Sequence, residues 1–375
     1  MLNSTLSTCE KFLFEHLLPN WSEHGIDAEH GYSYESLNHD WSRTSVGRLR
    51  LLTQCRQLYT FSHACKLKED SPWRDKLTPL FEFIISHYYL DDRWIFSLND
   101  DLTVKDEQSD AYALAFVLLS FSHYYQFSGD QRALSYMKQT HQFLMANMQA
   151  KTGGFYEAYP VDLTQVRRQN PHMHLLEGYI AAYQVSDDIQ YKQSIELLLN
   201  LTHEHFYDKN SRTLREFFTN DWQIHPEIGH QVEPGHHFEW VWLLYQAYKI
   251  CPDPVHLELA QQLFSTGTRH GMSEEGGVYN QIDANTYVPL DKEKRIWPIT
   301  EYLKAITVIP IGKEEKQLRL ESALGFMQQY YLQEDGRWNE YLDKENNAKD
   351  FPLPGTSSYH IFLGLVEVLT WQQAN

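Results

Sequence analysis

Histidines, and a glutamate beside one of them, are the residues of this sequence best suited to chemistry near neutral pH. The segment EPGHHFEW holds His236 and Glu239, and GTSSYHI holds His360. Glu239 lies three residues after His236, so on a helix the two share a face and the carboxylate can fix the tautomer or ring orientation of the imidazole. A surface salt bridge is the alternative use of Glu239. Imidazole has a pKa near the operating pH of most enzymes, so these segments indicate proton transfer.

Other polar and aromatic side chains stand within apolar stretches. Arg56 lies in LLTQCRQLYTF, where a buried guanidinium needs partners that a sugar hydroxyl or a carboxylate can supply; a structural ion pair is the alternative. Glu301 follows Trp297 in RIWPITE, and for it too a salt bridge is the alternative. Three aromatic residues can stack on a sugar face or simply fill the core: Tyr112, Trp240 and Trp297.

Closely spaced histidines also raise a metal interpretation. His172 and His174 form the HMH of NPHMHLLE, and His236 is followed by His237. Residues one or two apart on a helix do not face the same way, and the specific HExxH spacing is absent. No GxGxxG, GxxxxGK[ST] or GxSxG motif occurs either, so the sequence lacks the usual signatures of nucleotide-cofactor binding and of acyl transfer. We therefore predict neither a metal nor a cofactor, and assign His172 and His237 to supporting positions.

A short aromatic or β-branched turn recurs along the chain, and it predicts how these residues are positioned. Its six copies align on one hydrophobic residue each and are separated by steps of 59 to 64 residues. So even a spacing indicates an internal structural repeat. The aligned residues are Tyr32, Trp94, Phe155, Leu214, Val278 and Trp338.

Between the turns, apolar residues recur at three- and four-residue spacing, as in 132–148 and 238–250, which is helical periodicity. Each period has room for two helices. Six helical hairpins around an axis make an all-α (α/α)6 barrel, with short β-like turns at one end and an inner ring of helices that are apolar nearly all round. A solenoid is the rival, but solenoids usually have polar capping units, whereas 357–373 is as apolar as an interior copy. We expect one domain over 1–375.

The candidate residues fall into register with this period. If the second helix of each period is the inner one, inner helices begin near residues 46, 107, 170, 234, 297 and 355, and most of the polar residues lie in their first turns. A barrel would bring these residues together at one end. They are Arg56, Tyr112, His172, His174, His236, Glu239, Trp297, Glu301 and His360.

Composition narrows the class of ligand. The formal net charge of −18 argues against nucleic acid or an anionic membrane as a partner, because a polyanion would be repelled. Glu10, Lys11 and Glu15 interrupt what would have to be an apolar signal core, and the cysteines lack CxxC spacing. We expect a cytoplasmic protein with buried thiols and a neutral small-molecule ligand. The oligomeric state stays open.

At these residues the chain resembles the N-acylglucosamine 2-epimerase superfamily over essentially its whole length. The family pattern has an arginine in the first inner helix, a tyrosine in the second, H-x-x-E in the third, G-H-x-x-E in the fourth, W-P-x-x-E in the fifth and a histidine near the C-terminus. The five motifs other than the tyrosine, in this order at a period of about 60 residues, are specific together. The matching positions are Arg56, Tyr112, His174 with Glu177, His236 with Glu239, Trp297 with Glu301, and His360.

Departures from the family pattern bear on the substrate. Cellobiose epimerases of the family have a tandem Trp-Trp in the fifth motif, where this chain has Ile296 before Trp297. The phrase HFEW, rather than an epimerase-like HDIE, is similar to the mannose isomerase and sulfoquinovose isomerase branch. Recognition of a sulfonate would require additional cationic groups in the cleft, and the acidic composition of this chain does not indicate them. The resemblance thus implies a cofactor-independent isomerase that interconverts D-mannose and D-fructose, with D-lyxose and D-xylulose as a further substrate pair.

This reading implies catalytic roles for His236, as the C1/C2 proton shuttle through a cis-enediol, and for His360, as the acid/base that opens the sugar ring. The substrate-binding residues would be Arg56, Tyr112, His174, Glu239, Trp297 and Glu301. Three alternatives remain open at this point: a sugar 2-epimerase, a glycoside hydrolase that uses two of the glutamates, and a noncatalytic sugar-binding protein.

Overall fold

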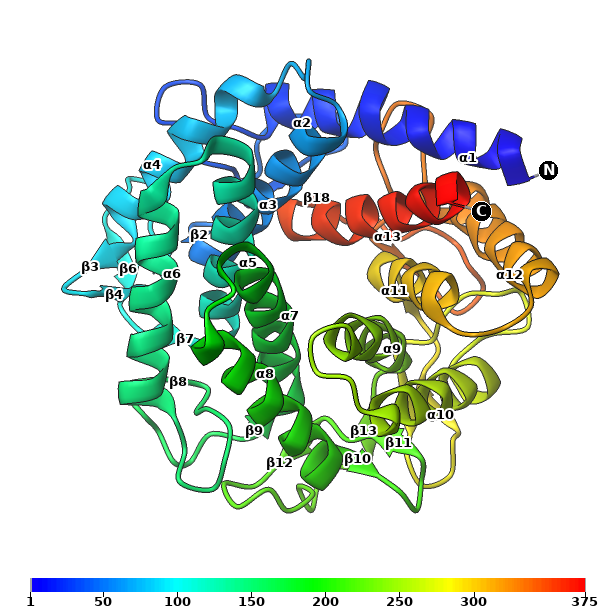
Figure 1. The fold of residues 1–375 in the computed structure, drawn as a ribbon. Helices are drawn as coiled ribbons and strands as arrows, with labels where there is room; N and C mark the ends of the chain where they lie inside the picture. Colours follow the sequence, from blue (N-terminus) through cyan, green and yellow to red (C-terminus); the bar gives the residue numbers. More distant parts are fainter. Residues whose placement is uncertain (1, 375) are drawn as a thin grey trace. The chain divides into compact units, whose positions relative to one another are not determined.

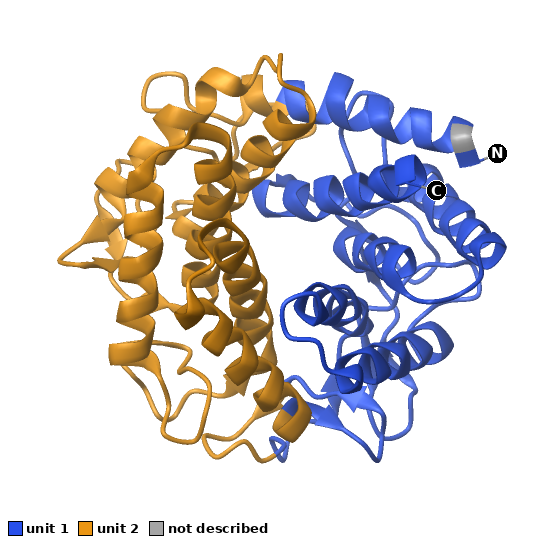
Figure 2. Cartoon of the chain, viewed as in Figure 1, with its two compact units in different colours: residues 1–20, 206–216, 224–375 blue, residues 21–205, 217–223 orange. Residues whose placement is uncertain are grey.

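The computed structural model describes residues 2–374, and most of them are helical (Figure 1). The chain divides into two compact units, coloured separately in Figure 2. Unit 1 comprises 1–20, 206–216 and 224–375, and unit 2 comprises 21–205 and 217–223. Each unit is described by itself below. Among the described residues, no helix has both the length and the apolar character needed to cross a membrane.

In unit 2, three long helices pack side by side, with the middle one, α5, in contact with the other two. Each is followed along the chain by a helix that packs against it on the outside (Figure 1). The inner helices are α3 (Leu51–Leu67), α5 (Ala111–Ser128) and α7 (Gln169–Ser186). Their outer partners are α4 (Leu77–His87), α6 (Gln131–Phe143) and α8 (Ile189–Leu201).

Unit 1 repeats this plan, with α11 packed between α9 and α13. Its inner helices are α9 (Pro234–Tyr248), α11 (Ile296–Val308) and α13 (Gly355–Ala374). The outer helices α10 (Pro254–His270) and α12 (Lys313–Phe326) follow the first two, and α1 (Leu2–Lys11), from the other end of the chain, packs on α12 and α13. The chain also forms helix α2 (Leu18–His24).

Burial separates inner from outer helices as the apolar pattern predicts. In α11 every residue from Ile296 to Thr307 is buried, which fits a helix covered on all sides. The outer helix α6 buries only Ala133, Met137, Thr140 and His141, the one-sided stripe of an amphipathic helix.

The six expected turns are present, and each holds an antiparallel bridge to the residues that follow an outer helix. In the first copy the bridging residue is Ser33, one position after the aligned Tyr32, and in the others it is the aligned residue itself. Four of these six are isolated bridges, Ser33 with Ile26, Phe155 with Gln149, Val278 with Met272 and Trp338 with Leu332; the other two lie in the short hairpins β3–β4 (Tyr89–Leu90, Arg93–Trp94) and β10–β11 (Tyr207–Asp208, Thr213–Leu214).

Short antiparallel strands also lead into the inner helices. In unit 2 they form β2–β5–β6 (Leu49–Arg50, Ser97–Leu98, Val104–Asp106), β7–β8 (Ser109–Asp110, Ala158–Tyr159) and β9–β12 (Arg167–Arg168, Phe217–Phe218). In unit 1 they form β13–β14–β15 (Gln231–Val232, Gln281–Asp283, Pro289–Asp291) and β16–β17 (Lys294–Arg295, Tyr341–Leu342). Two further strands are β1 (Ser36–Leu37) and β18 (Leu353–Pro354).

These strands explain where the predicted helix starts were wrong. The inner helices expected near residues 46 and 107 begin at Leu51 and Ala111, because β2 and β7 hold the preceding backbone extended. The other four begin within a residue of their expected positions, at Gln169, Pro234, Ile296 and Gly355.

Candidate active site

In unit 1, His236 lies at the start of α9 with a carboxylate against its ring. Its Nδ1 is 3.0 Å from Oε1 of Glu216, and both side chains are buried. Glu216 comes from the turn after β11 and also accepts a hydrogen bond from the backbone N–H of Glu233 at 3.3 Å. An ionised carboxylate can only accept, so Nδ1 carries the proton and Nε2 holds the lone pair when the imidazole is neutral.

Three carboxylates govern the charge of this imidazole. Burial by itself lowers the pKa of His236, but the negative charges of Glu216, Glu233 and Glu239 outweigh burial and raise the pKa to about 10. Burial, in turn, raises the pKa of Glu233. At neutral pH His236 is therefore mainly an imidazolium, and its positive charge is stabilised by these three carboxylates.

A glutamate also supports the start of the inner helix in two other copies of the repeat, in which the residue at the position of His236 is not a histidine. Glu35 and Glu157 each stand two residues after the bridging residue of their turn, as Glu216 does. Each accepts the backbone N–H of the residue before an inner helix, and that residue is an arginine whose guanidinium completes an ion pair of 2.7 Å. The pairs are Glu35 with Arg50 and Glu157 with Arg168.

In the fourth copy the residue before the inner helix is Glu233 instead of an arginine. The cation that would neutralise Glu216 is thus replaced by a second carboxylate, and the Glu216 carboxylate contacts His236. This replacement is the structural origin of the raised pKa of His236.

His360, near the start of α13, is held in the same manner. Its Nδ1 is 2.8 Å from Oε1 of Glu301 on α11, and Glu301 is wholly buried. The indole of Trp297 contacts both histidines, with ring centroids 5.0 Å from His236 and 5.7 Å from His360. Trp297 thus links the two proposed proton carriers and fixes their rings by packing.

A glycine makes room for this indole. Gly235 is the second residue of α9, and a Cβ added there would lie 2.5 Å from the ring of Trp297, inside any real contact distance. The glycine of the G-H-x-x-E motif therefore lets Trp297 approach the helix start beside His236.

One group of ligand atoms within unit 1 has the proximity that a cation site needs. Single atoms of Glu239, Glu301 and His360 lie within 4.8 Å of one another, and all three residues are buried. The ammonium of Lys304 already forms an ion pair of 2.7 Å with Glu301. A bound cation would have to share that carboxylate with the lysine, so the group is a poor fit for a resident metal.

In unit 2, Arg56 and Tyr112 are brought together. Nη2 of Arg56 donates to the Tyr112 hydroxyl at 2.7 Å, and the guanidinium lies 4.3 Å from the ring centre of Phe116. Arg56 is buried, so this cation is desolvated and held by aromatic neighbours. Such a guanidinium is suited to bind an oxygen that gains negative charge.

His174 completes the unit 2 cluster. Its Nδ1 is 3.1 Å from Oε2 of Glu177, three residues later on α7, and both are buried. Its ring meets Tyr112 edge to face at 4.9 Å and Phe116 at 4.8 Å. The third histidine of the candidate set thus also has its Nδ1 held by a carboxylate.

The supporting histidines differ from these three. Nδ1 of His172 and of His237 faces the carbonyl oxygen four residues earlier, and Nε2 accepts a backbone N–H, from Phe155 and Leu214 respectively. With both ring nitrogens on the backbone, neither can share a metal ion, so the HMH and HH pairs do not form the metal site that was considered. Each clamps an inner helix to the bridging residue of a turn. Trp240, fully buried beside Phe206, is a core residue.

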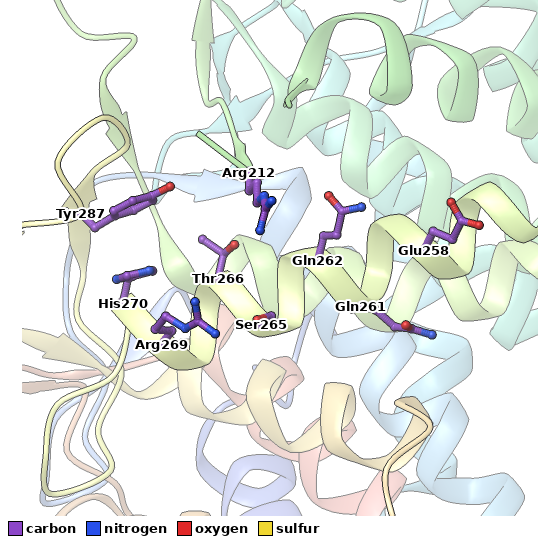
Figure 3. Close-up of a pocket in the computed structure, with 9 residues that line it drawn as sticks. All are labelled: Arg212, Glu258, Gln261, Gln262, Ser265, Thr266, Arg269, His270 and Tyr287. Carbon is purple, nitrogen blue, oxygen red and sulfur yellow. The ribbon is translucent and has the colours of Figure 1, made fainter. Parts of the chain in front are cut away.

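A surface groove of about 490 Å³ lies elsewhere, along the outer helix α10. Figure 3 shows it lined by residues such as Arg212, Arg269 and Tyr287, with His270 stacked on Tyr287 at 4.1 Å. Its described lining contains none of the expected site residues, so it is not the candidate active site.

Glu216, Glu233 and Lys304 at the site were not identified from the sequence. Glu216 had a usable signal, because a glutamate stands at the same turn position in three other copies, as Glu35, Glu157 and Glu340. Lys304 had none, since a lysine one turn after Glu301 reads as an ordinary helix residue until its complete burial is seen.

Comparison with known proteins places this geometry among sugar enzymes. Residues 31–364 match the family model described as N-acylglucosamine 2-epimerase. The chain is 29% identical to a protein named mannose-6-phosphate isomerase from Rhizobium meliloti, over 94% of this chain and 93% of that one. It is 24% identical to a cellobiose 2-epimerase from Bacteroides fragilis, over 74% and 75% of the two chains. It is 23% identical to a D-mannose isomerase from Marinomonas mediterranea, over 92% of each.

Solved structures agree on the fold. A cellobiose 2-epimerase from Bacillus thermoamylovorans superposes with a TM-score of 0.88 at 21% identity, covering 98% of this chain and 99% of that one. A D-mannose isomerase gives 0.86 at 22% identity over 98% and 97%. An alpha-mannanase from Bacteroides thetaiotaomicron gives 0.71 at 14% identity over 99% and 97%. The expected all-α (α/α)6-barrel class is confirmed.

Proposed function

Because the chain belongs to the N-acylglucosamine 2-epimerase family, we propose that this sugar isomerase or epimerase is an aldose–ketose isomerase that interconverts D-mannose and D-fructose without a cofactor. The observation that carries the proposal is the pair His236 and His360, each with Nδ1 on a buried glutamate and both against Trp297. We further expect the enzyme to be cytoplasmic.

The first step is ring opening. The neutral His360, with its proton on Nδ1, accepts the anomeric hydroxyl proton at Nε2, the C1–O5 bond breaks to give the open aldehyde, and the imidazolium passes this proton to O5, which becomes a hydroxyl. Glu301 stabilises the imidazolium that forms, because its carboxylate is already in contact with Nδ1.

The second step moves a proton from C2 to C1. The base form of His236 removes the C2 proton, and the electron pair forms the C1–C2 double bond of a cis-enediolate with its negative charge on O1. The O2–H proton passes to O1, and the imidazolium then returns its proton to C1 as the electrons left on O2 form the C2 ketone. From the family resemblance we expect Arg56 and His174 to bind the oxygens that carry negative charge.

One base on one face suffices for this isomerisation, whereas epimerisation at C2 needs a proton delivered from the opposite face. The cellobiose 2-epimerase relatives make epimerisation the second candidate. Ile296, where a second indole would serve a disaccharide, favours a monosaccharide.

The relative named mannose-6-phosphate isomerase makes the phosphorylated sugar a specific alternative substrate. Against it, three arginines that precede inner helices are engaged by carboxylates of their own units, which leaves less positive charge for a phosphate. These are Arg50 with Glu35, Arg168 with Glu157, and Arg295 with Glu340. Free mannose is therefore our choice.

The test is NMR of chelator-treated protein with D-mannose, with fructose and glucose followed separately, and a parallel run with mannose 6-phosphate. Fructose as the early product supports the proposal. Early glucose indicates a 2-epimerase, and conversion of only the phosphorylated sugar moves the assignment to that substrate. Release of sugars from a mannan, with no isomerisation, would instead support a hydrolase like the mannanase of similar fold.

A further inference from the structure

A lysine lies completely buried behind the histidine assigned to ring opening, and the mechanism above does not use it. Lys304 stands on α11 one turn after Glu301, and both side chains are fully enclosed. Its Nζ is 2.7 Å from Oε2 of Glu301. Burial of an ammonium is costly unless charge and contact compensate for it, so the position calls for an explanation.

Three inner helices of unit 1 contribute to the surroundings of this ammonium. Nζ of Lys304 lies 4.4 Å from the ring centre of Trp242 on α9, a cation–π contact. Trp242 is itself fixed, because its Nε1 donates to Oε2 of Glu367 on α13 at 2.9 Å. The lysine thus lies between an aromatic face and a carboxylate, each on a rigid element.

The two oxygens of Glu301 have separate partners. Oε2 faces Lys304, and Oε1 lies 2.8 Å from Nδ1 of His360. A carboxylate that keeps its negative charge can only accept at Oε1, which requires the His360 proton on Nδ1 and leaves the Nε2 lone pair as the reactive site. A protonated Glu301 could donate instead, and the imidazole would then take the opposite tautomer.

We propose that Lys304 is a positioning residue for His360: its ammonium keeps Glu301 as a carboxylate, and Glu301 in turn holds His360 in the tautomer with hydrogen on Nδ1. The catalytic consequence rests on the ring-opening role proposed for His360, whereas the tautomer itself does not. Lys304 thereby supplies, from within the chain, the fixed positive charge that a metal ion provides at other sites.

A purely structural role explains the arrangement less well. Buried ion pairs contribute little net stability, and well-packed apolar residues of similar volume often do as well or better. Lys294, another lysine of unit 1 with almost no exposure, shows a structural solution, since its Nζ donates to the carbonyl oxygens of Lys292 and Lys344. Lys304 instead contacts the carboxylate that holds His360.

The test is ¹⁵N NMR of the His360 ring in the full-length protein, with assignment by its loss in His360→Asn. Wild type is expected to show the proton on Nδ1. In Lys304→Met the buried Glu301 loses its neutralising cation, and the His360 signal is expected to shift toward the tautomer with hydrogen on Nε2. Lys304→Gln, which keeps a hydrogen-bond donor without charge, is expected to shift it too and serves if the methionine variant does not fold. Lys304→Arg retains the cation and the wild-type tautomer.

Two variants separate positioning from packing. Lys294→Met is the matched control, expected to lose thermal stability with the His360 tautomer unchanged. The double variant Lys304→Met with Glu301→Gln is expected to show the same His360 signal as Glu301→Gln alone, because without the carboxylate the ammonium has nothing through which to act on His360. An unchanged His360 tautomer in folded Lys304→Met and Lys304→Gln would overturn the proposal.

Activity gives the second readout. If the proposed isomerase activity is present, Lys304→Met should lower kcat for mannose by about 10²-fold with a smaller change in KM, a loss in the range of one general acid–base group. If wild type proves inactive on every aldose, the proposed function fails, yet the tautomer measurement still decides the role of Lys304.

Discussion

Each histidine of the candidate set, His174, His236 and His360, has a buried glutamate at Nδ1, whereas His172 and His237 use both nitrogens on backbone groups. The carboxylate fixes the proton on Nδ1, so that Nε2 holds the lone pair, and it strengthens the imidazole as a base, while in the supporting histidines both nitrogens contact the backbone. At the scale of single residues, the partner of Nδ1 is therefore what separates a proposed catalyst from a support.

Glu216→Gln should alter the pH dependence of isomerisation. The negative charge of Glu216 is among the causes that raise the pKa of His236, and glutamine removes that charge but still accepts a hydrogen bond. The pKa of His236 should fall, so the rise of kcat/KM with pH, which reports the base form of His236, should move to lower pH. Glu157→Gln, which removes the equivalent carboxylate beside Arg168, is the control. An unchanged pH profile of kcat/KM in Glu216→Gln would show that His236 is not the base whose ionisation the profile reports.

His360→Ala should lower kcat for mannose by about 10²- to 10⁴-fold, the usual contribution of a general acid–base group. Initial rates by fructose detection measure the loss. His87→Ala, on the outer helix α4, is the control and should keep the wild-type rate. Full activity in His360→Ala would contradict the division of roles between the two histidines.

At the scale of single residues, the sequence indicated the candidate residues but not the contacts between them. Glu301 was predicted to bind substrate, whereas its carboxylate lies against Nδ1 of His360. The carboxylate at Nδ1 of His236 is Glu216, twenty residues away, rather than Glu239 on the same helix. Helical spacing shows which residues share a face of one helix, and it carries no information about a turn that folds back onto the helix start.

At the scale of the helices, His237 fastens the start of α9 to the turn at Leu214. Replacing His237 by leucine keeps the volume but leaves the buried N–H of Leu214 without its acceptor. The free energy of unfolding should fall by about 1–3 kcal/mol, the cost of one unsatisfied buried group. Urea unfolding measures it, with the half-buried His230→Leu as the control.

The same clamps predict acid sensitivity. Burial lowers the pKa of His237 to about 4 and that of His172 to about 3, whereas in the unfolded chain both groups have the ordinary value of 6.5. Between pH 6.5 and about 4 the unfolded state binds more protons, so stability should fall as the pH is lowered. For His237 the loss is on the order of 3 kcal/mol. Urea midpoints in this range should fall less in His237→Leu than in wild type.

The start of a helix was predictable where the local sequence pattern itself marks it. Proline at the start of α9 and the apolar run of α11 marked their beginnings within a residue. The starts of α3 and α5 were not, because the residues before them are held by two-residue strands whose partners lie about fifty residues away. Such pairing is a tertiary effect that overrides local propensity.

At the scale of the whole chain, the net charge of −18 predicts a response to salt. Repulsion among excess carboxylates opposes the compact state, and added ions screen it. The Tm at pH 7.5 should therefore rise by a few degrees between about 10 and 200 mM NaCl. An uncharged osmolyte at equal osmolality is the control, and a Tm that falls with salt would show that surface ion pairs outweigh the repulsion.

The repeat made the fold class predictable at this scale, since six evenly spaced turns indicate hairpins and helical apolar patterns indicate their packing. The prediction of one domain over 1–375 stays a prediction. The substrate was less predictable, because it depends on individual side chains that vary between copies, such as Ile296.

The joint between turn and inner helix, built from Glu35 with Arg50 and Glu157 with Arg168, has an evolutionary consequence. In the copy that carries His236, the carboxylate at this joint is retained while the arginine is exchanged for Glu233. In a repeat protein, one copy can thus gain a histidine held for proton transfer by substitution of a few residues, because the glutamate that orients the histidine is already present at the joint. The remaining copies keep the architecture intact while that one diverges.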